Sequence, residues 1–234
     1  MNETKQAITN STSDSVKMLR AMVGIGVMCA LLIVLTYEGT LPRIERLKAE
    51  ALEKAIFRVI PGITSTKAFQ LNQNGSFSDS IHKESSGSVV YAGYDDKNQL
   101  IGVAVEASGQ GYADIIRILY GYNHETQTIV GFYVLESKET PGLGDKIEKE
   151  EAFLENFKSL DVSLIDDFSA IKNPVVTVKQ GAKENAWEVD GITGATISSR
   201  AIGEIISSST SEMLPLLYKN IEVFKVQKDN QGNE

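Results

Sequence analysis

The sequence is poor in the side chains that most often hold metals. It has one cysteine, Cys29, and two histidines, His82 and His124, among 234 residues. A single cysteine excludes an intramolecular disulfide, a zinc site built from thiolates and an iron–sulfur cluster held by this chain alone. We therefore expect no metal site and no catalytic side chain, and assign no role to these three residues. The chemistry should rest on hydroxyl groups, backbone amides or a bound cofactor.

Positive charge is also in short supply. Lysine and arginine number 23 against 31 aspartates and glutamates, so the formal net charge is −8. Nucleic-acid binding needs clustered basic residues that displace the counterions of phosphates, so we expect no nucleic-acid partner. Hydrophobic residues make up 42% of the chain and charged residues 23%, which is typical of a folded protein rather than a disordered one.

A long hydrophobic run lies near the N-terminus. Residues 21–37 carry no charge and are bounded by Arg20 and Glu38. As a helix this run is roughly 26 Å long, slightly shorter than the hydrocarbon core of a bilayer, and flanking basic side chains can reach the headgroups. A cleaved signal peptide is the alternative, but no A-x-A-like site follows the run, and Cys29 lies inside it rather than at a lipoprotein cleavage site. We predict an uncleaved transmembrane helix in contact with lipid at 17–38.

The rest of the chain suits one domain. Residues 1–16 are polar and predict a disordered tail, and 39–62 predict a membrane-proximal amphipathic helix that ends at Pro61 and Gly62. The domain should occupy 63–220, followed by a flexible tail at 221–234. Basic residues flank the hydrophobic run on both sides, so charge alone leaves the orientation across the membrane open.

Hydrophobic periodicity within 63–220 predicts an α+β fold, with an antiparallel sheet and flanking helices. We expect strands at 89–94 and 100–107 joined by a tight turn, and a second pair at 115–122 and 129–136. The last of these is apolar on both faces, so it should be covered on both sides. A helix at 148–159, a strand at 175–179 and a long helix at 197–218 follow. The polar stretch 70–88 predicts turns or a peripheral hairpin.

The most informative loop comes just before the long helix, at Asp190-Gly191-Ile192-Thr193-Gly194-Ala195-Thr196. Its glycines allow a close backbone approach to a ligand. The free N–H groups and the dipole at a helix start favour a phosphate. Capping of the helix by Thr193 or Thr196 is the alternative, and it needs no ligand.

Two further loops are rich in glycine. Residues 136–146 contain Thr140-Pro141-Gly142-Leu143-Gly144, which can form a cup of backbone amides or an ordinary turn into the next helix. Gly109 and Gly111 can admit a flat ligand or form a bulge or turn. They do not fit the dinucleotide-binding fingerprint.

Taken together, these loops resemble the FMN-binding domain family, in particular the membrane-bound flavoprotein subunits of the Rnf complexes and the Na⁺-translocating NADH:quinone reductase (Nqr) complexes. The resemblance rests on 139–144 and 190–196, and covers the hydrophobic run and roughly 88–218. The length and the run from Thr140 to Lys146 are more similar to the Rnf G subunit than to the Nqr C subunit. One departure is Ser137, where members often have histidine.

The resemblance implies how the cofactor is held. In the family, the last threonine of the second motif carries FMN through a phosphoester, installed from FAD by a flavin transferase, and this position is Thr196. Asp190, together with Gly194 and Ala195, is implied in transferase recognition or in the turn itself. The residues expected to line the cofactor are Glu139, Thr140, Gly142, Leu143, Gly144, Lys146, Thr193, Gly194 and Ala195.

The implied function is electron relay between ferredoxin and NAD⁺ within an ion-translocating complex. The implied partners are membrane and iron–sulfur subunits, and the flavin domain is expected on the extracytoplasmic or periplasmic side of the cytoplasmic membrane, held by a single span. Gly24, Gly26 and Ala30 are small enough for close helix contact with those partners. The alternatives are the Nqr C subunit, a stand-alone flavin-binding regulator, and a binding module whose Thr-Gly-Ala-Thr turn only caps a helix.

Overall fold

The computed structural model describes residues 2–79 and 87–225, with side chains from residue 16 onward. The chain divides into two compact units, Met1–Glu50 and Ala51–Glu234. Helix α1 (Asn2–Val59) provides all of the first unit and begins the second. His82 and the rest of 80–86 lie outside the described residues.

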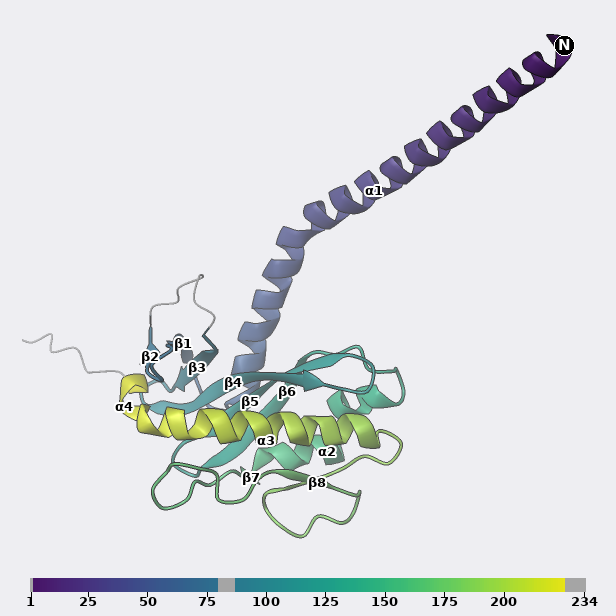
Figure 1. Ribbon diagram of the computed structural model, residues 1–234. Coiled ribbons are helices and arrows are strands. Elements are labelled where there is room, and N and C mark those ends of the chain that lie inside the picture. Colours follow the sequence, from purple (N-terminus) through teal and green to yellow (C-terminus); the bar gives the residue numbers. More distant parts are fainter. Residues whose placement is uncertain (1, 80–86, 226–234) are drawn as a thin grey trace, which may run out of the picture. The chain divides into compact units, whose positions relative to one another are not determined.

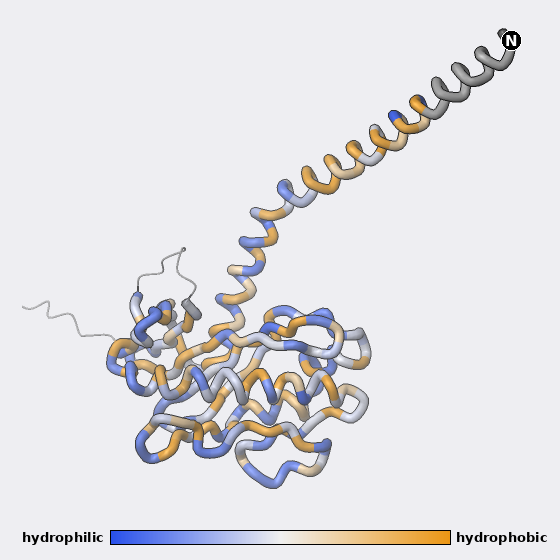
Figure 2. The backbone as a smooth tube through the Cα atoms, viewed as in Figure 1, coloured by the Kyte–Doolittle hydropathy of each residue, from blue (hydrophilic) through white to orange (hydrophobic). Residues whose placement is uncertain are grey.

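The first unit contains the hydrophobic run. Residues 16–40 are all exposed, and α1 is the one helix in the described part of the chain that is long and apolar enough to cross a membrane. Figure 2 shows the hydrophobic stretch along α1. The sequence predicts a disordered tail at 1–16, whereas the backbone is helical from Asn2, because extending a formed helix requires no new nucleation. Pro42 lies inside the same helix, so no break separates the two predicted segments.

The second unit is built on a seven-stranded sheet in the order β2-β1-β3-β4-β5-β6-β7, with every neighbouring pair antiparallel (Figure 1). The predicted antiparallel sheet is therefore confirmed, and β3 to β6 match the four predicted strands to within three residues. The strands are β1 (Ser65–Leu71), β2 (Phe77–Ser78), β3 (Val89–Tyr94), β4 (Leu100–Gln110), β5 (Ile115–Asn123), β6 (Thr128–Glu136) and β7 (Leu160–Asp161).

Helices cover the two faces of the sheet. Helix α3 (Thr196–Lys219) lies along one face, where Ile202, Ile206 and Leu217 join the main core (Figure 1). On the other face, the last turns of α1 place Ile56 and Val59 in a second, smaller core. Strand β5, an interior strand of the sheet, is buried on both faces. The sequence predicts that β6 is covered on both sides, but only Ile129 and Phe132 of its residues are buried because it lies next to the sheet edge.

Glycines on two neighbouring strands allow α1 to end against the sheet. A Cβ atom built on Gly121 of β5 would lie 2.0 Å from the Val59 carbonyl oxygen, and one on Gly131 of β6 would lie 2.4 Å from it. These two glycines are paired in the register of β5 and β6. Any side chain at either position would push the end of α1 away from the sheet.

The remaining elements differ in detail from expectation. In place of one helix at 148–159 there are η1 (Gly144–Glu148), α2 (Glu151–Glu155) and η2 (Asn156–Lys158). Strand β8 (Val176–Val178) pairs in parallel with β9 (Glu188–Asp190), which the sequence did not predict. The tail predicted at 221–234 forms α4 (Ile221–Phe224) at its start, because Phe224 is fully buried against Phe69 and Phe77. Residues 226–234 lie outside the described residues.

Candidate cofactor site

A single buried carboxylate joins the three glycine-rich loops. Glu139 is only 5% exposed. Its Oε1 accepts a hydrogen bond of 2.9 Å from the backbone N–H of Ala113, in the turn between β4 and β5. Its Oε2 accepts a short hydrogen bond from the Ser198 hydroxyl, in the first turn of α3. The fold therefore brings together three loops that are far apart in the sequence.

Two glycines make room for this carboxylate. A Cβ atom on Gly111 would lie 2.6 Å from Glu139 Oε1, and a Cβ atom on Gly144 would lie 2.5 Å from Oε2. Ser137 supports the same turn, because its hydroxyl accepts a hydrogen bond of 3.2 Å from the Glu139 backbone N–H. Ser137 thus has a structural contact of its own.

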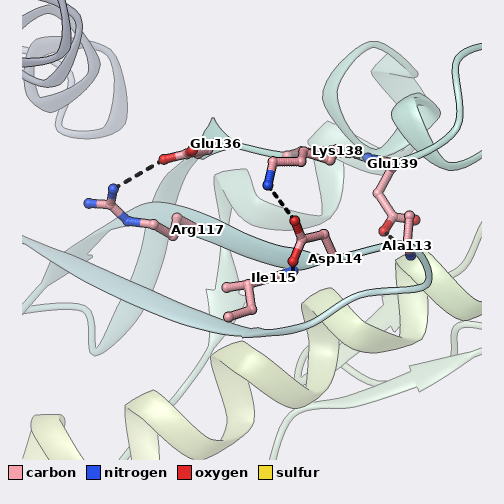
Figure 3. Close-up of polar contacts among 8 residues, drawn as sticks. Ala113, Asp114, Ile115, Arg117, Glu136, Lys138 and Glu139 are labelled. Atoms are coloured by element: carbon pink, nitrogen blue, oxygen red, sulfur yellow. Dashed lines mark hydrogen bonds and ion pairs between the residues drawn. The ribbon is translucent and has the colours of Figure 1, made fainter. Parts of the chain in front are cut away.

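Ion pairs also connect neighbouring strands and the loops at their ends (Figure 3). Lys138 Nζ lies 2.5 Å from Asp114 Oδ2, which links the loop after β6 to the turn before β5. This hydrogen bond lowers the pKa of Asp114 and raises that of Lys138. Arg117 of β5 pairs with Glu106 of β4 and, at 3.3 Å, with Glu136 of β6. Exposed pairs of this kind contribute little to stability, so the buried Glu139 is the main polar link between the loops.

Three exposed apolar residues stand next in sequence to residues of this buried contact. Tyr112, Leu143 and Ile197 are each more than half exposed. Each is the sequence neighbour of a residue that touches Glu139: Ala113, Gly144 and Ser198. We call these three side chains the apolar rim. Exposed apolar side chains beside polar groups are typical of ligand sites, so these three are candidates for contact with a flat ring.

The structure places the predicted lining residues in two groups. Thr140, Gly142 and Leu143 are exposed on the loop around Glu139, Gly144 is buried beneath them, and Lys146 is half-buried. Gly142 adopts φ +79° and donates a hydrogen bond of 2.6 Å from its N–H to Asp145 Oδ1. The carboxylate of Glu139 itself points away from solvent toward Ala113 and Ser198.

The second group surrounds the start of α3. Thr196 is the first residue of the helix and is exposed, while Ala195 occupies the N-cap position without a side-chain capping bond. The capping role considered for Thr193 or Thr196 is therefore not what the structure has. Thr196 Oγ1 donates only a long hydrogen bond of 3.5 Å to the Ile192 carbonyl. Gly194 adopts φ +85°, which a residue with a side chain rarely adopts. The turn leaves the Thr196 hydroxyl accessible.

A cavity of about 420 Å³ opens beside this hydroxyl. Its lining contains two cations, Lys179 and Arg200, and no carboxylate, although the whole chain carries a net charge of −8. Hydroxyl, amide and cationic donors are the groups that bind phosphate. The lining residues are Thr177, Val178, Lys179, Gln180, Gly191, Ile192, Thr193, Thr196, Ser199 and Arg200. This donor set fits the phosphate end of a phosphorylated cofactor.

Two other cavities have a different chemistry. One of about 450 Å³ between β3, β4 and α3 includes Glu106 and Glu212 in its lining and no cation. Another of about 630 Å³ beside β6 mixes Arg58 and Lys158 with Glu151 and Glu155. Of these three, the cavity at Thr196 is the one suited to an anion. Within residues 16–79 and 87–225, whose side chains the structure describes, no cluster of three or more His, Cys, Asp or Glu side chains could hold a metal ion.

Comparison with known proteins identifies the class of this domain. The FMN-binding domain family matches residues 111–210, a range that contains the Ala113 turn, the Glu139 loop and the start of α3. The C subunit of a Na⁺-translocating NADH-quinone reductase from Parabacteroides distasonis superposes with a TM-score of 0.56 and 23% identity, covering 80% of this chain and 98% of that one. The NqrC of Shewanella oneidensis superposes with a TM-score of 0.53 and 21% identity, over 70% and 86%. The fold and the site define an FMN-binding domain.

Sequence relatives narrow the class. The G subunit of an ion-translocating oxidoreductase complex from Methanosarcina acetivorans is 31% identical over 86% of this chain and 95% of its own length. The G subunit of a Na⁺-translocating ferredoxin:NAD⁺ oxidoreductase complex from Acetobacterium woodii is 25% identical over 88% and 95%. The G subunit of the ion-translocating oxidoreductase complex from Escherichia coli is 32% identical over 48% and 50%. The chain belongs to the family of G subunits of ion-translocating oxidoreductase complexes.

Several residues of the site were not predicted from the sequence. Ala113 and Ser198 are ordinary residues whose importance comes from the Glu139 contact. Lys179 and Gln180 directly follow β8 and lie 17 and 16 residues before Thr196, and no local pattern connects them to it. Arg200 could have been noticed, because residues four apart on a helix share a face and Thr196 starts that helix.

Proposed function

We propose that Thr196 carries FMN through a phosphoester bond. The observation that carries this proposal is the accessible Thr196 hydroxyl beside a cationic, carboxylate-free cavity in an FMN-binding domain. A phosphate linked to Thr196 would lie where the backbone N–H groups and dipole of α3 favour negative charge.

The attachment is a balanced transfer from FAD. The Thr196 oxygen forms a bond to the phosphorus on the FMN side of the FAD pyrophosphate, the pyrophosphate P–O bond breaks, AMP leaves and the hydroxyl proton is released. A flavin transferase carries out this step and recognises the segment from Asp190 to Thr196, including Gly194 and Ala195.

The flavin ring would rest on the apolar rim of Tyr112, Leu143 and Ile197. Thr140, Gly142 and Gly144 would shape the adjoining loop, and Lys146 would supply positive charge. Bound FMN accepts one or two electrons, so this chain needs no acid, nucleophile or metal of its own. Its own groups hold and orient the cofactor, and Glu139 keeps the three loops in place.

At the level of the complex, we propose an electron carrier in an Rnf-type ion-translocating ferredoxin:NAD⁺ oxidoreductase. The family membership and the apolar part of α1 support a single membrane span that contacts lipid, with membrane and iron–sulfur subunits as partners. The flavin domain is proposed on the extracytoplasmic side. A role as the Nqr C subunit is the second candidate, favoured by the shared fold alone.

The test is the intact mass of the full chain produced with and without the flavin transferase. The expected gain is the mass of FMN less one water, together with flavin fluorescence of the band on a denaturing gel. Thr196→Val should abolish both signals, whereas Ser211→Ala, which removes an exposed hydroxyl further along α3 and outside the cavity, should retain them. A fluorescent Thr196→Val band would place the attachment elsewhere, and a wild-type chain of unchanged mass would refute the covalent link.

A further inference from the structure

Two cations line the cavity beside Thr196 and come from different elements. Arg200 lies four residues after Thr196 on α3, so the two side chains share one face of the helix, and both line the cavity. Lys179 lines the same cavity and directly follows β8. An anion attached to Thr196 would therefore share this cavity with one arginine and one lysine.

Among the described residues, neither cation has an acidic partner. Ion pairs there engage Lys67, Lys138, Lys149, Lys158 and Arg117, among others. Within the same described ranges, Lys179 and Arg200 form no ion pair, although acidic residues outnumber basic ones in the sequence. Their charge is available to a ligand.

The segment that carries Lys179, at the end of β8 and just after it, is hydrogen-bonded to the turn before α3. The Gly191 N–H donates to the Val178 carbonyl at 3.0 Å, and the Thr193 N–H donates to Gln180 Oε1 at the same distance. Strand β8 also lies tightly on α3, since a Cβ atom on Gly203 would be 2.0 Å from Thr177 Oγ1.

Asp190 completes this arrangement. Its Oδ1 accepts a hydrogen bond of 2.7 Å from the Gly181 N–H, just after Lys179 and Gln180. The Asp190 backbone is held in turn by Asn156, which accepts from its N–H at 3.0 Å and donates to its carbonyl at 3.1 Å. Asp190 is absent from the cavity lining, so its carboxylate does not oppose an anion there.

We propose that Arg200 and Lys179 bind the phosphate that joins the flavin to Thr196. In this proposal, Asp190 and Gln180 position the segment after β8 that carries Lys179. The proposal rests on the proposed attachment at Thr196 and adds to it the residues that hold the phosphate. Guanidinium binds phosphate oxygens in a two-pronged geometry, and a charge-assisted hydrogen bond is stronger than a neutral one. Asp190 thereby acquires a structural role inside the domain, separate from recognition by a transferase.

The experiment compares FMN with riboflavin, which lacks the phosphate. Full-length Thr196→Val protein in detergent binds both ligands without covalent attachment, and affinities are read from quenching of flavin fluorescence. We expect FMN to bind more tightly than riboflavin. Arg200→Gln and Lys179→Gln, each added to this variant, should lower the FMN-to-riboflavin affinity ratio by about tenfold, the effect of one hydrogen bond to a charged group. Riboflavin affinity should stay the same.

Lys219→Gln is the matched control, because it removes one positive charge from the exposed end of α3 opposite to Thr196. It should leave the ratio unchanged, and thermal unfolding verifies that all variants are folded. Asp190→Asn weakens the hydrogen bond to Gly181 and should lower the ratio less than Lys179→Gln does. Two results would overturn the proposal that Arg200 and Lys179 bind the phosphate. One is equal affinity of Thr196→Val for FMN and riboflavin, and the other is an affinity ratio that neither cation variant changes.

A second measurement uses the flavin-loaded protein. The ³¹P resonance of the phosphodiester should move in Arg200→Gln and Lys179→Gln and stay in place in Lys219→Gln. An unmoved resonance in both cation variants also overturns the proposal that these two residues bind the phosphate. If the wild-type chain gains no flavin mass, the proposed attachment itself is refuted. If the wild-type chain is loaded but the cation variants change neither the affinity ratio nor the ³¹P resonance, only the role of Arg200 and Lys179 is refuted.

Discussion

Replacing Glu139 with alanine tests the central link of the site. The change removes the acceptors of two hydrogen bonds, from the Ala113 N–H and the Ser198 hydroxyl, in a place that is 5% exposed. Hydrogen bonds to a charged group contribute about 1.5–3 kcal/mol each, and their donors would be left buried without partners. We expect the free energy of unfolding to fall by about 3–5 kcal/mol. For a domain of this size, this corresponds to a loss of about 10 °C in Tm.

Graded variants separate this link from general damage. Glu139→Gln retains an oxygen for Ala113 but replaces the acceptor of Ser198, so it should lose only about 1–2 kcal/mol. Glu204→Ala removes an exposed glutamate from α3 and should change stability by less than about 0.5 kcal/mol. The assay is urea and thermal unfolding of the full chain in detergent, monitored by circular dichroism.

The loops should lose their mutual position along with the stability. In flavin-loaded protein, Glu139→Ala should therefore shift the flavin absorption spectrum and midpoint potential, while the covalent attachment at Thr196 persists. A loss of under about 1 kcal/mol in Glu139→Ala, or equal losses in Glu139→Ala and Glu139→Gln, would refute the reasoning that this carboxylate joins the loops.

Three further predictions follow from close contacts and burial. Gly121→Ala should destabilise the domain by about 1–3 kcal/mol or more in urea unfolding, because its Cβ would lie 2.0 Å from the Val59 carbonyl oxygen. Gly144→Val should shift the flavin spectrum and potential without preventing attachment, because its Cβ would lie 2.5 Å from Glu139 Oε2. Burial lowers the pKa of His124, so the unfolded chain takes up a proton before the folded one and stability should fall as the pH drops below about 6.5. His124→Gln should flatten that pH dependence in urea unfolding between pH 5 and 8.

Each of these outcomes has a matched comparison. Gly39 has no atom within 4 Å of a built Cβ, so Gly39→Ala should not destabilise the protein. Gly142→Ala adds a side chain in open space but at φ +79°, so it separates backbone strain from crowding at Gly144. For His124, the nearby charges of Glu125, Glu222 and Lys225 partly offset one another, and burial remains the largest influence on its pKa. A His124→Gln profile that parallels the wild type would contradict the assignment.

Local patterns were sufficient for much of the architecture. The hydrophobic run of α1, the strands β3 to β6 and helix α3 were all recognisable, because side-chain periodicity and turn residues act over a few positions along the chain. The motif around Thr196 and the loop around Glu139 were also visible in the sequence. Strand β1 and strand β9 were missed, since their pairing is decided by distant strands rather than by their own residues.

The sequence by itself determined the membrane-compatible helix, the antiparallel sheet and the residues that resemble a flavin-attachment motif. Only the tertiary structure decided that these residues form one site. Glu139 meets Ala113 across 26 residues and Ser198 across 59, and Lys179, just after β8, lines the same cavity as Thr196. Such contacts are set by how sheet and helices pack in space, and periodicity along the chain carries no record of them.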